Sequence, residues 1–339
     1  MKTTLIFLIA MVAIVTTVSA QRVAALHSPA GVTLFTSGNI FVDAYNAALP
    51  GDTIYLSGGD FAAPALFDKR LVVFGAGYHP AHTAATRPTT ITNDFNLGDN
   101  ADNMVLEGVH FRAGFRVANN IPVNNITVRR SRIDGGIHYP GNLATPSVGN
   151  TFAECVIIGN SDFANASNLL INNSIIQDRV WNSRWNNFRN SIFMATSTDW
   201  GWSLFINASL NVFSNNVVIT THNFIGGEDN SFLNNIFVNA ATALGTNPTA
   251  SGNYLGVPQA SIFVSHTGHT FSYASDFNLR TPATHVGNDG TQVGIFGGQS
   301  PFKPGGIPQN PHISLRNIAP HTAPDGRLNI QVTVSAQER

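Results

Sequence analysis

The sequence predicts an all-β protein: a right-handed parallel β-helix, or solenoid, with a short amino-terminal helical cap and an extended carboxy-terminal tail. Two observations predict this fold. A short phrase rich in Asn recurs along much of the chain, and the composition suits many short strands joined by tight turns. Charged residues make up only 11% of the chain, against roughly 25% in ordinary domains. Apolar residues make up 43%, which argues against a disordered chain.

The first element is an export signal. The chain starts with a basic residue, Lys2, continues with an apolar run from Leu5 to Val15, and has small residues before Gln21. The apolar run is shorter than the roughly 20 residues of a membrane-spanning helix. We therefore expect residues 1–20 to be a signal peptide. The mature protein is then secreted, at the cell surface or in the periplasm, with no membrane insertion after cleavage.

An amino-terminal cap comes next. The segment Ile40–Leu49 predicts a short helix, Pro50 and Gly51 a turn, and the residues that follow, up to Phe61, a first strand. A solenoid needs such a cap because its end coil would otherwise expose its apolar interior.

The recurring phrase begins near residue 104 and returns at intervals of roughly 17 to 26 residues. Its alignment gives a largely polar column, and two residues later an apolar column. Residues two apart share one face of a strand, so both columns are expected to face inward. The first column contains Val109, Ser131, Cys155, Asn173, Asn190, Asn216, Asn235 and Asn253. The second contains Phe111, Ile133, Ile157, Ile175, Ile192, Val218, Phe237 and Leu255.

Stacking explains how asparagine can occupy an inward position. An isolated buried amide would be costly, whereas stacked Asn side chains satisfy one another and the turn backbone. Asn also tolerates the left-handed backbone conformation of tight corners. The pattern therefore predicts a buried Asn ladder at a corner of the solenoid, with Cys155 as a small buried member. Because Cys155 is the only cysteine, it forms no intrachain disulfide.

The domain prediction has three parts. Residues 1–20 form the signal peptide, 21–280 the solenoid with its cap, and 281–339 a tail rich in Gly and Pro that packs on the solenoid. Alternating apolar and polar residues from Leu328 to Val334 predict a terminal strand in this tail.

The segment Ala44–Phe61, with Pro50–Ile54 at its centre, resembles the amino-terminal coil of secreted polysaccharide lyases of the chondroitinase B and alginate lyase type. The Asn-rich phrases resemble the pectin-lyase-like repeat of pectate lyases and polygalacturonases. The stretch Gly287–Ala336 resembles the tail of uncharacterised secreted β-helix proteins of Bacteroidetes-type bacteria. These resemblances imply the fold and a polysaccharide ligand.

The catalytic residues of those enzymes do not carry over. The lyases use a Lys and Arg pair, but no Lys lies between residues 101 and 260. The hydrolases use clustered aspartates, and Asp134–His138 has no adjacent pair of aspartates.

Charged side chains gather on three successive predicted coils. Adjacent strands lie about 4.8 Å apart, so these groups can interact, and together they can bind an acidic sugar and hold a base. The catalytic candidates are His110, Arg132 and Glu154, and the substrate-binding candidates are Arg112, Arg130 and Asp134. The alternative is a solvated face whose charges pair for solubility.

All four tryptophans lie within 22 residues of chain, and they are Trp181, Trp185, Trp200 and Trp202. An indole ring offers a flat apolar face to a sugar and keeps an N–H donor. Arg184 and Arg189 nearby can pair with acidic substituents. The hypothesis is a glycan platform, and the alternative is that the rings pack a loop over the solenoid or fill a corner.

A cofactor is not expected. The segment Gly226–Asn230 offers carboxylate and carbonyl oxygens for calcium, but it lacks the dense Asp and Asn pattern of a calcium loop, and a plain turn explains it better. The spacing of His266, His269 and His285 does not favour zinc. The net charge of −1 gives no reason to expect nucleic acid as a partner.

The resulting function hypothesis is a secreted β-helix protein that recognises a polysaccharide at the cell surface. One alternative is a polysaccharide lyase or glycoside hydrolase acting on an acidic glycan. The other is a structural surface or assembly protein.

Overall fold

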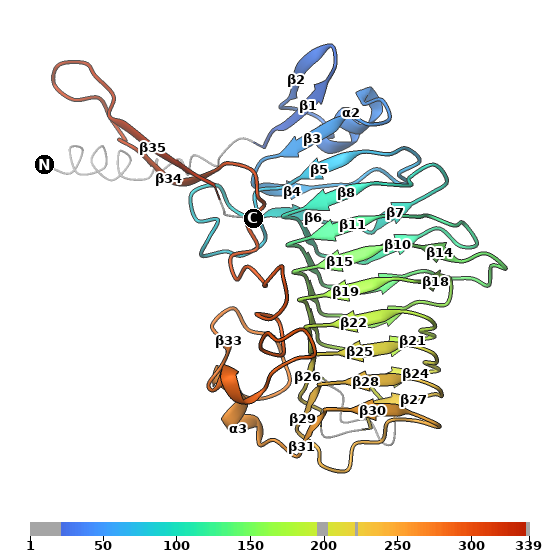
Figure 1. Cartoon of the computed structure of the whole chain (residues 1–339). Helices are drawn as coiled ribbons and strands as arrows, with labels where there is room; N and C mark the ends of the chain where they lie inside the picture. The colour runs from blue at the N-terminus through green and yellow to red at the C-terminus, as the bar shows by residue number, and fades with distance from the viewer. Residues whose placement is uncertain (1–21, 195–202, 221–222, 337–339) are drawn as a thin grey trace, which may run out of the picture.

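The computed structural model describes residues 22–194, 203–220 and 223–336. It confirms the predicted fold class: parallel strands stack into a β-solenoid of about ten turns (Figure 1). Three sheets run along the solenoid, and we call them sheets A, B and C.

Sheet A contains, in spatial order, β2 (Gly31–Phe35), β1 (Ala24–Ser28), β3 (Thr53–Leu56), β5 (Val72–Phe74), β8 (Val105–Glu107), β11 (Thr127–Arg129), β15 (Thr151–Ala153), β19 (Leu170–Asn172), β22 (Asn187–Arg189), β25 (Val212–Ser214), β28 (Ser231–Leu233) and β30 (Thr249–Ser251).

Sheet B contains β4 (Gly59–Phe61), β6 (Thr89–Ile91), β9 (His110–Phe111), β12 (Arg132–Ile133), β16 (Val156–Ile157), β20 (Ile175–Ile176), β23 (Ile192–Phe193), β26 (Val217–Val218), β29 (Ile236–Phe237) and β31 (Tyr254–Leu255). Sheet C contains β7 (Phe95–Leu97), β10 (Phe115–Val117), β13 (Ile137–His138), β17 (Ser161–Asp162), β21 (Val180–Trp181), β24 (Phe205–Ile206) and β27 (Ile225–Gly226). A side ribbon pairs β14 (Ser147–Val148) with β18 (Ala166–Ser167).

The amino-terminal cap combines a helix with a hairpin. Helix α2 (Ile40–Ala47) lies where the sequence predicted it, and it buries Ile40, Phe41, Ala44 and Tyr45 on one face. Strand β3 is the predicted first strand, but the antiparallel strands β1 and β2 precede it and extend sheet A. The cap therefore covers the interior of the first coil and also adds an edge hairpin that the sequence had not indicated.

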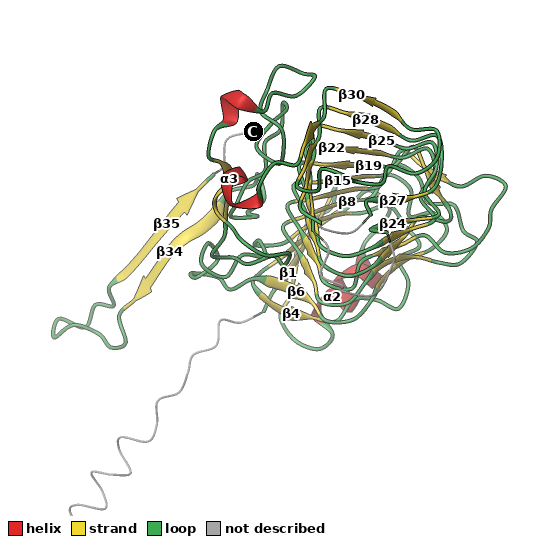
Figure 2. Ribbon diagram, turned by 90° about the horizontal axis from the view of Figure 1, so that it is seen from below, coloured by secondary structure: helices red, strands yellow, loops and turns green. Residues whose placement is uncertain are grey.

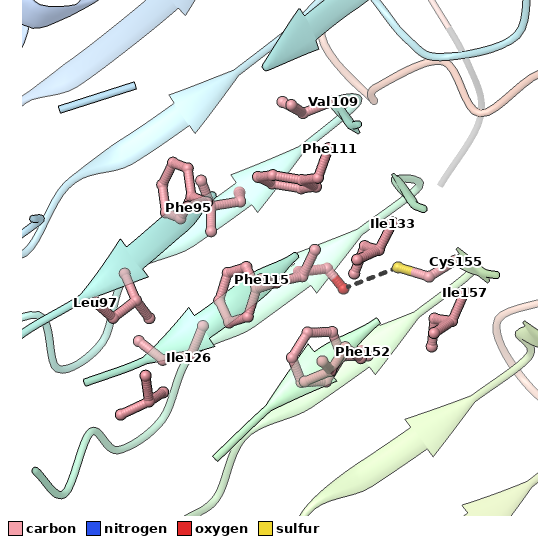
Figure 3. Close-up of a cluster of buried hydrophobic side chains, with 14 of the residues drawn as sticks. Phe95, Leu97, Val109, Phe111, Phe115, Ile126, Ile133, Phe152, Cys155 and Ile157 are labelled. Carbon is pink, nitrogen blue, oxygen red and sulfur yellow. Dashed lines mark hydrogen bonds between the residues drawn. The ribbon is translucent and has the colours of Figure 1, made fainter. Parts of the chain in front are cut away.

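Aromatic side chains fill the interior. Phe188, Phe213 and Phe232 stack from coil to coil with ring centroids 5.0 and 5.2 Å apart and planes within 9° of parallel. Figure 3 shows Phe95, Phe115 and Phe152 in the same interior, with Cys155 at its edge. Burial of this aromatic area is the main favourable contribution to folding.

The predicted ladder is present, but two of its members were assigned wrongly. Strand pairing aligns Ile175 and Ile192 with Val156 and Val217, so Ser174 and Ser191 occupy the ladder positions in place of Asn173 and Asn190. A shift of one residue exchanges the two faces of a strand. The apolar residues that follow are therefore Ile176 and Phe193, and Ile175 and Ile192 point outward.

The corrected ladder is hydrogen-bonded from coil to coil between Cys155 and Asn253. There the backbone N–H of each ladder residue donates to the ladder side chain of the next coil. Ser191 N donates to Asn216 Oδ1 at 2.9 Å, and Asn216 N donates to Asn235 Oδ1 at 3.0 Å. The Nδ2 group of Asn216 donates to the carbonyl oxygen of Phe188 at 2.9 Å, so no part of this buried amide is left without a partner.

The residue before each ladder position turns the corner between sheets A and B in the left-handed conformation. This corner column has φ between 45° and 72° and consists of Gly108, Arg130, Glu154, Asn173, Asn190, Asn215, Asn234 and Gly252. Gly and Asn are the residues that adopt this conformation most readily. Asn173 and Asn190 therefore serve the corner rather than the ladder.

A second ladder, which the sequence analysis missed, lies at the start of the sheet A strands. Leu169 N donates to Asn186 Oδ1, Asn186 N to Asn211 Oδ1, and Asn211 N to Asn230 Oδ1, at 2.9 to 3.0 Å. Its signal is an Asn two residues before a stacked Phe, as in Asn186 and Phe188. Asn230, considered above for calcium, is a buried member of this ladder.

The solenoid ends earlier than predicted. Its last strand, β31, ends at Leu255, and the segment from 257 to 280 leaves the coil as α3 (Gln259–Ile262) and the antiparallel pair β32 (Phe263–Ser265) and β33 (Asp276–Leu279). The assignment of these residues to the solenoid was wrong because a short apolar strand looks the same in sequence whether its partner is parallel or antiparallel. The 3₁₀ helix η1 (Pro282–Thr284) follows.

Residues 257–310, which we call the appended lobe, pack against the outer face of sheet B (Figures 1 and 2). Five consecutive coils present aliphatic side chains there, and the lobe buries them completely: Val156, Ile175, Ile192, Val217 and Ile236. Close backbone approach explains the Gly-rich composition of the lobe. A Cβ atom on Gly306, for example, would lie 2.1 Å from Cε1 of Tyr78.

The chain ends in a separate hairpin of β34 (His312–Ile318) and β35 (Ile330–Ser335), which projects from the body (Figure 2). The predicted terminal strand is thus one half of a pair. Exposed apolar side chains include Ile313, Ile330 and Val334. In the part of the chain that the structure describes, no helix has the length and apolar character needed to span a membrane.

We predict that Asn216→Leu destabilises the protein by about 1–3 kcal/mol, because the neighbouring N–H and C=O groups lose their partner in the interior. The matched control is Asn172→Leu on the outer face of sheet A, which should change stability by less than about 0.5 kcal/mol. Urea unfolding measures both. Equal effects of the two substitutions would contradict a stabilising role for the ladder.

Candidate functional site

The predicted charged patch divides into two clusters with different surroundings. His110, Arg132 and Asp134 lie on the outer face of sheet B beside the appended lobe. Arg130 and Glu154 lie in the corner column, where the carboxy-terminal segment covers them. Arg112 stands apart and pairs with Asp60 at 3.5 Å on the surface, an exposed contact of little energetic weight.

The first cluster is a network centred on Asp134. His110 Nε2 lies 2.7 Å from Asp134 Oδ2, and Arg132 Nε lies 2.6 Å from Oδ1. Burial acts to raise the pKa of Asp134, but the hydrogen bonds from His110 and Arg132 outweigh it and hold the pKa below its ordinary value. Both carboxylate oxygens are thus engaged by cationic or potentially cationic groups, and Asp134 stays ionised.

This network also supports the lobe. The Arg132 guanidinium lies over the rings of Tyr273 and Phe271, at 5.2 and 5.8 Å from their centroids. Burial raises the pKa of Tyr273. His110, Arg132 and Asp134 therefore form the base on which two lobe aromatics rest, rather than the floor of an open cleft.

The second cluster is buried. Arg130 is 2% exposed, and its Nε lies 2.9 Å from Glu154 Oε2 and its Nη1 3.7 Å from Glu107 Oε1. Two backbone groups of the lobe complete it. The carbonyl oxygen of Ile307 accepts from Arg130 Nη1, and the N–H of Gln309 donates to Glu107 Oε1 at 2.8 Å.

Burial raises the pKa of Glu154 despite the neighbouring Arg130. A carboxyl with a raised pKa can be a general acid or base. Here, however, the Ile307–Gln309 segment lies over the cluster, so Arg130 and Glu154 reach no external ligand while the lobe is in place. Their observed contacts fasten the lobe to the corner column.

Trp181 and Trp185 lie on a different side of the solenoid. Trp181 is the outward residue of β21 in sheet C and is half-buried. Trp185 occupies a left-handed corner just before β22, and 54% of its surface is exposed. Arg184 stacks over its ring at 4.2 Å. Trp200 and Trp202 lie outside the described residues.

A groove of about 350 Å³ crosses the outer face of sheet A beside Trp185. Strands β19, β22 and β25 form it on three adjacent coils, and it is lined by Asn168, Leu170, Asn187, Arg189, Val212 and Ser214. Asn168 N donates to the carbonyl oxygen of Trp185 at 2.9 Å, so the backbone of Trp185 lies next to the corner end of the groove. Arg189, which the sequence analysis noted beside the tryptophans, is exposed on its floor.

Sequence reasoning found Trp185 and Arg189 but not the groove. Leu170, Asn187 and Val212 align on consecutive strands, and so do Asn172, Arg189 and Ser214. This alignment depends on the register of sheet A, and the repeat alignment addressed only the ladder of sheet B. The second ladder, had it been recognised, would have given this register.

The calcium segment Gly226–Asn230 forms a plain corner between sheets C and A, with Asp229 in the left-handed conformation. Among the described residues, no three His, Cys, Asp or Glu side chains gather as metal ligands would.

A comparison with protein families, curated proteins and solved structures returned no match for this chain. The lyase resemblance of the first coil therefore remains a prediction.

We predict that the appended lobe loosens on acidification. Burial lowers the pKa values of His79, His266 and His285, which are in the lobe or pack against it. Each folded-state pKa lies below the ordinary 6.5, so the unfolded lobe binds protons more strongly, and stability is lost as pH falls below about 6.5.

Hydrogen exchange of residues 257–310 at about pH 5 and about pH 7.5 measures this effect, after correction for the intrinsic rate. The stacked Phe strands of the solenoid serve as the internal control and should keep their protection. His79→Gln, which cannot titrate, should reduce the difference. Equal lobe protection at the two pH values would contradict the prediction.

Proposed function

We propose that this protein binds an acidic polysaccharide in the sheet A groove. One observation carries the proposal: the exposed guanidinium group of Arg189 and the amide side chains of Asn168 and Asn187 line one groove on adjacent coils. The exposed Trp185, with Arg184 over its ring, belongs to the corner next to this groove. An indole face packs on the apolar face of a sugar ring, and a guanidinium group pairs with a carboxylate through two parallel N–H donors.

The repeat geometry favours a polymer over a small ligand. Groups on successive coils recur about every 4.8 Å along the solenoid, so the groove presents contacts at a regular spacing. Asn187 and Asn168 supply amide groups that can both donate to and accept from hydroxyls. An extended chain can use these contacts together, which raises affinity without any single strong contact.

A lyase or hydrolase is not favoured by the geometry. Of the three catalytic candidates, Glu154 lies under the lobe, and His110 and Arg132 are both engaged by Asp134 beneath lobe aromatics. None of them lines the groove. The binding hypothesis uses Trp185, Arg184 and Arg189, and it needs no residue that is buried or already engaged in an ion pair.

The test is titration of the mature protein with a panel of uronate polymers by calorimetry. We expect at least one polymer to bind, and Trp185→Ala and Arg189→Ala each to weaken binding by about tenfold or more, because stacking or a charge-assisted pair is lost. Higher salt should weaken polymer binding by the wild-type protein more than polymer binding by Arg189→Ala. Arg316→Ala, on the distant terminal hairpin, is the matched control for a lost positive charge.

Three results would count against the proposal: no binding to any uronate polymer, loss of binding in Arg316→Ala as well, or binding that survives Trp185→Ala combined with Arg189→Ala. The double variant Trp200→Ala, Trp202→Ala tests whether the remaining tryptophans extend the platform. Release of unsaturated products during the titration would instead support the lyase alternative.

A further inference from the structure

The appended lobe contains a second concave site, on a different face from the groove. A pocket of about 260 Å³ opens between the β32–β33 pair, the segment from Phe296 to Pro304 and the loop that carries His79. Aromatic rings form most of its wall: Phe271, Tyr273, Phe277, Phe296 and Phe302. Drug-sized ligands occupy roughly 300–1,000 Å³, so this pocket has room for about one ring.

The aromatic wall is held in place by the solenoid. Tyr273 rests on Arg132, which Asp134 fixes, and the edge of the His79 ring meets Tyr273 at 4.5 Å. Phe271 N donates to Gln177 Oε1 at 2.5 Å. Phe271 and Phe277 lie within 10° of parallel with centroids 6.2 Å apart, so they form one continuous wall. A site fixed from outside in this way loses little entropy when it binds a ligand.

Polar groups occupy one side of the pocket. Asp276 Oδ1 accepts hydrogen bonds from the N–H and the Nδ2 group of Asn278, at 2.9 and 2.7 Å. Its other oxygen, Oδ2, accepts no bond from any residue in the described part of the chain. Ser272 and Ser275 also line the pocket, although Ser275 Oγ lies 2.9 Å from His266 Nδ1 and Ser272 Oγ accepts a hydrogen bond from Ala274 N. The pocket therefore combines polar side chains, Asp276 among them, with its aromatic rings.

Charge narrows the choice of ligand. The residues that line the pocket include the carboxylate of Asp276 but no Lys or Arg, so an acidic sugar would be repelled. An organic cation fits less well, because the Arg132 guanidinium already lies over Tyr273 and Phe271. A neutral sugar ring satisfies both sides: its C–H face packs on the rings and its hydroxyls donate to Asp276.

We propose that this pocket binds a single neutral hexopyranose ring, such as the end or a side branch of a glycan. The inference does not depend on the sheet A groove, which lies on another face of the solenoid and favours acidic sugars. The protein then has two carbohydrate sites: one for acidic sugars, built by the coils, and one for neutral sugars, built by the lobe against sheet B.

The experiment uses the mature protein and three kinds of probe: methyl glycosides of neutral hexoses, methyl glucuronoside, and tetramethylammonium. Saturation-transfer NMR and calorimetry report binding. We expect at least one neutral hexoside to bind at millimolar concentration and the glucuronoside to bind more weakly. Asp276→Asn, which keeps the shape but removes the charge, should weaken hexoside binding by about tenfold. Phe296→Ala should weaken it further, and Arg316→Ala should not.

Hydrogen exchange of the lobe shows whether each variant keeps its fold. If Phe296→Ala loosens the lobe, the near-isosteric Asp276→Asn decides the question alone. The proposal is overturned if no neutral hexoside binds, if binding is the same in Asp276→Asn as in the wild type, or if tetramethylammonium binds in preference to every hexoside.

Discussion

The left-handed corner between sheets A and B is the constraint on which the rest of the structure depends. One residue with positive φ turns the chain, and the next residue places its side chain in the ladder. This order fixes the register of the sheet B strands from β9 to β31, and so decides which side chains enter the aromatic interior and which face outward. A shift of one residue at the corner would move Ser191 out of the ladder and turn Ile192 inward. The ladder bonds make such a shift costly because each amide bridges coils.

The same corner also anchors the carboxy-terminal segment. Asn173 Nδ2 donates to the carbonyl oxygens of Ile295 and Gly297, and Asn215 Oδ1 accepts from the N–H of Asn288. The Arg130–Glu154 pair completes this line of contacts toward the amino-terminal coils. Polar corner groups thus supply partners for an irregular backbone, which otherwise could not be buried over the aliphatic face of sheet B. The groove on sheet A is open because no comparable segment among the described residues covers it.

The sequence predicted the fold class well because the ladder repeats at short range and requires few residue types. It predicted the site less well, for a physical reason that Ser174 and Ser191 illustrate. In the phrase Asn172-Asn173-Ser174-Ile175, either Asn173 or Ser174 can satisfy a ladder, and only the neighbouring coils decide between them. The misplaced register hid the outward aliphatic column, and with it the need for a covering lobe. Arg130 and Glu154 looked exposed because the lobe that covers them was not anticipated. Trp185 and Arg189 could be found because a corner and a strand keep them exposed whatever covers sheet B.

The lobe has a consequence for the kinetics of folding. Its contacts with the corner column join residues far apart in sequence: 73 residues separate Asn288 from Asn215, and 202 separate Gln309 from Glu107. Coil-to-coil bonds such as Asn216 to Asn235 span only 19. Contacts between distant residues form slowly because a long loop must close first. We therefore expect the coils to assemble before the lobe docks, so that the row of valines and isoleucines on sheet B faces water for part of the folding reaction. Aggregation during refolding should begin at that face and fade as docking proceeds.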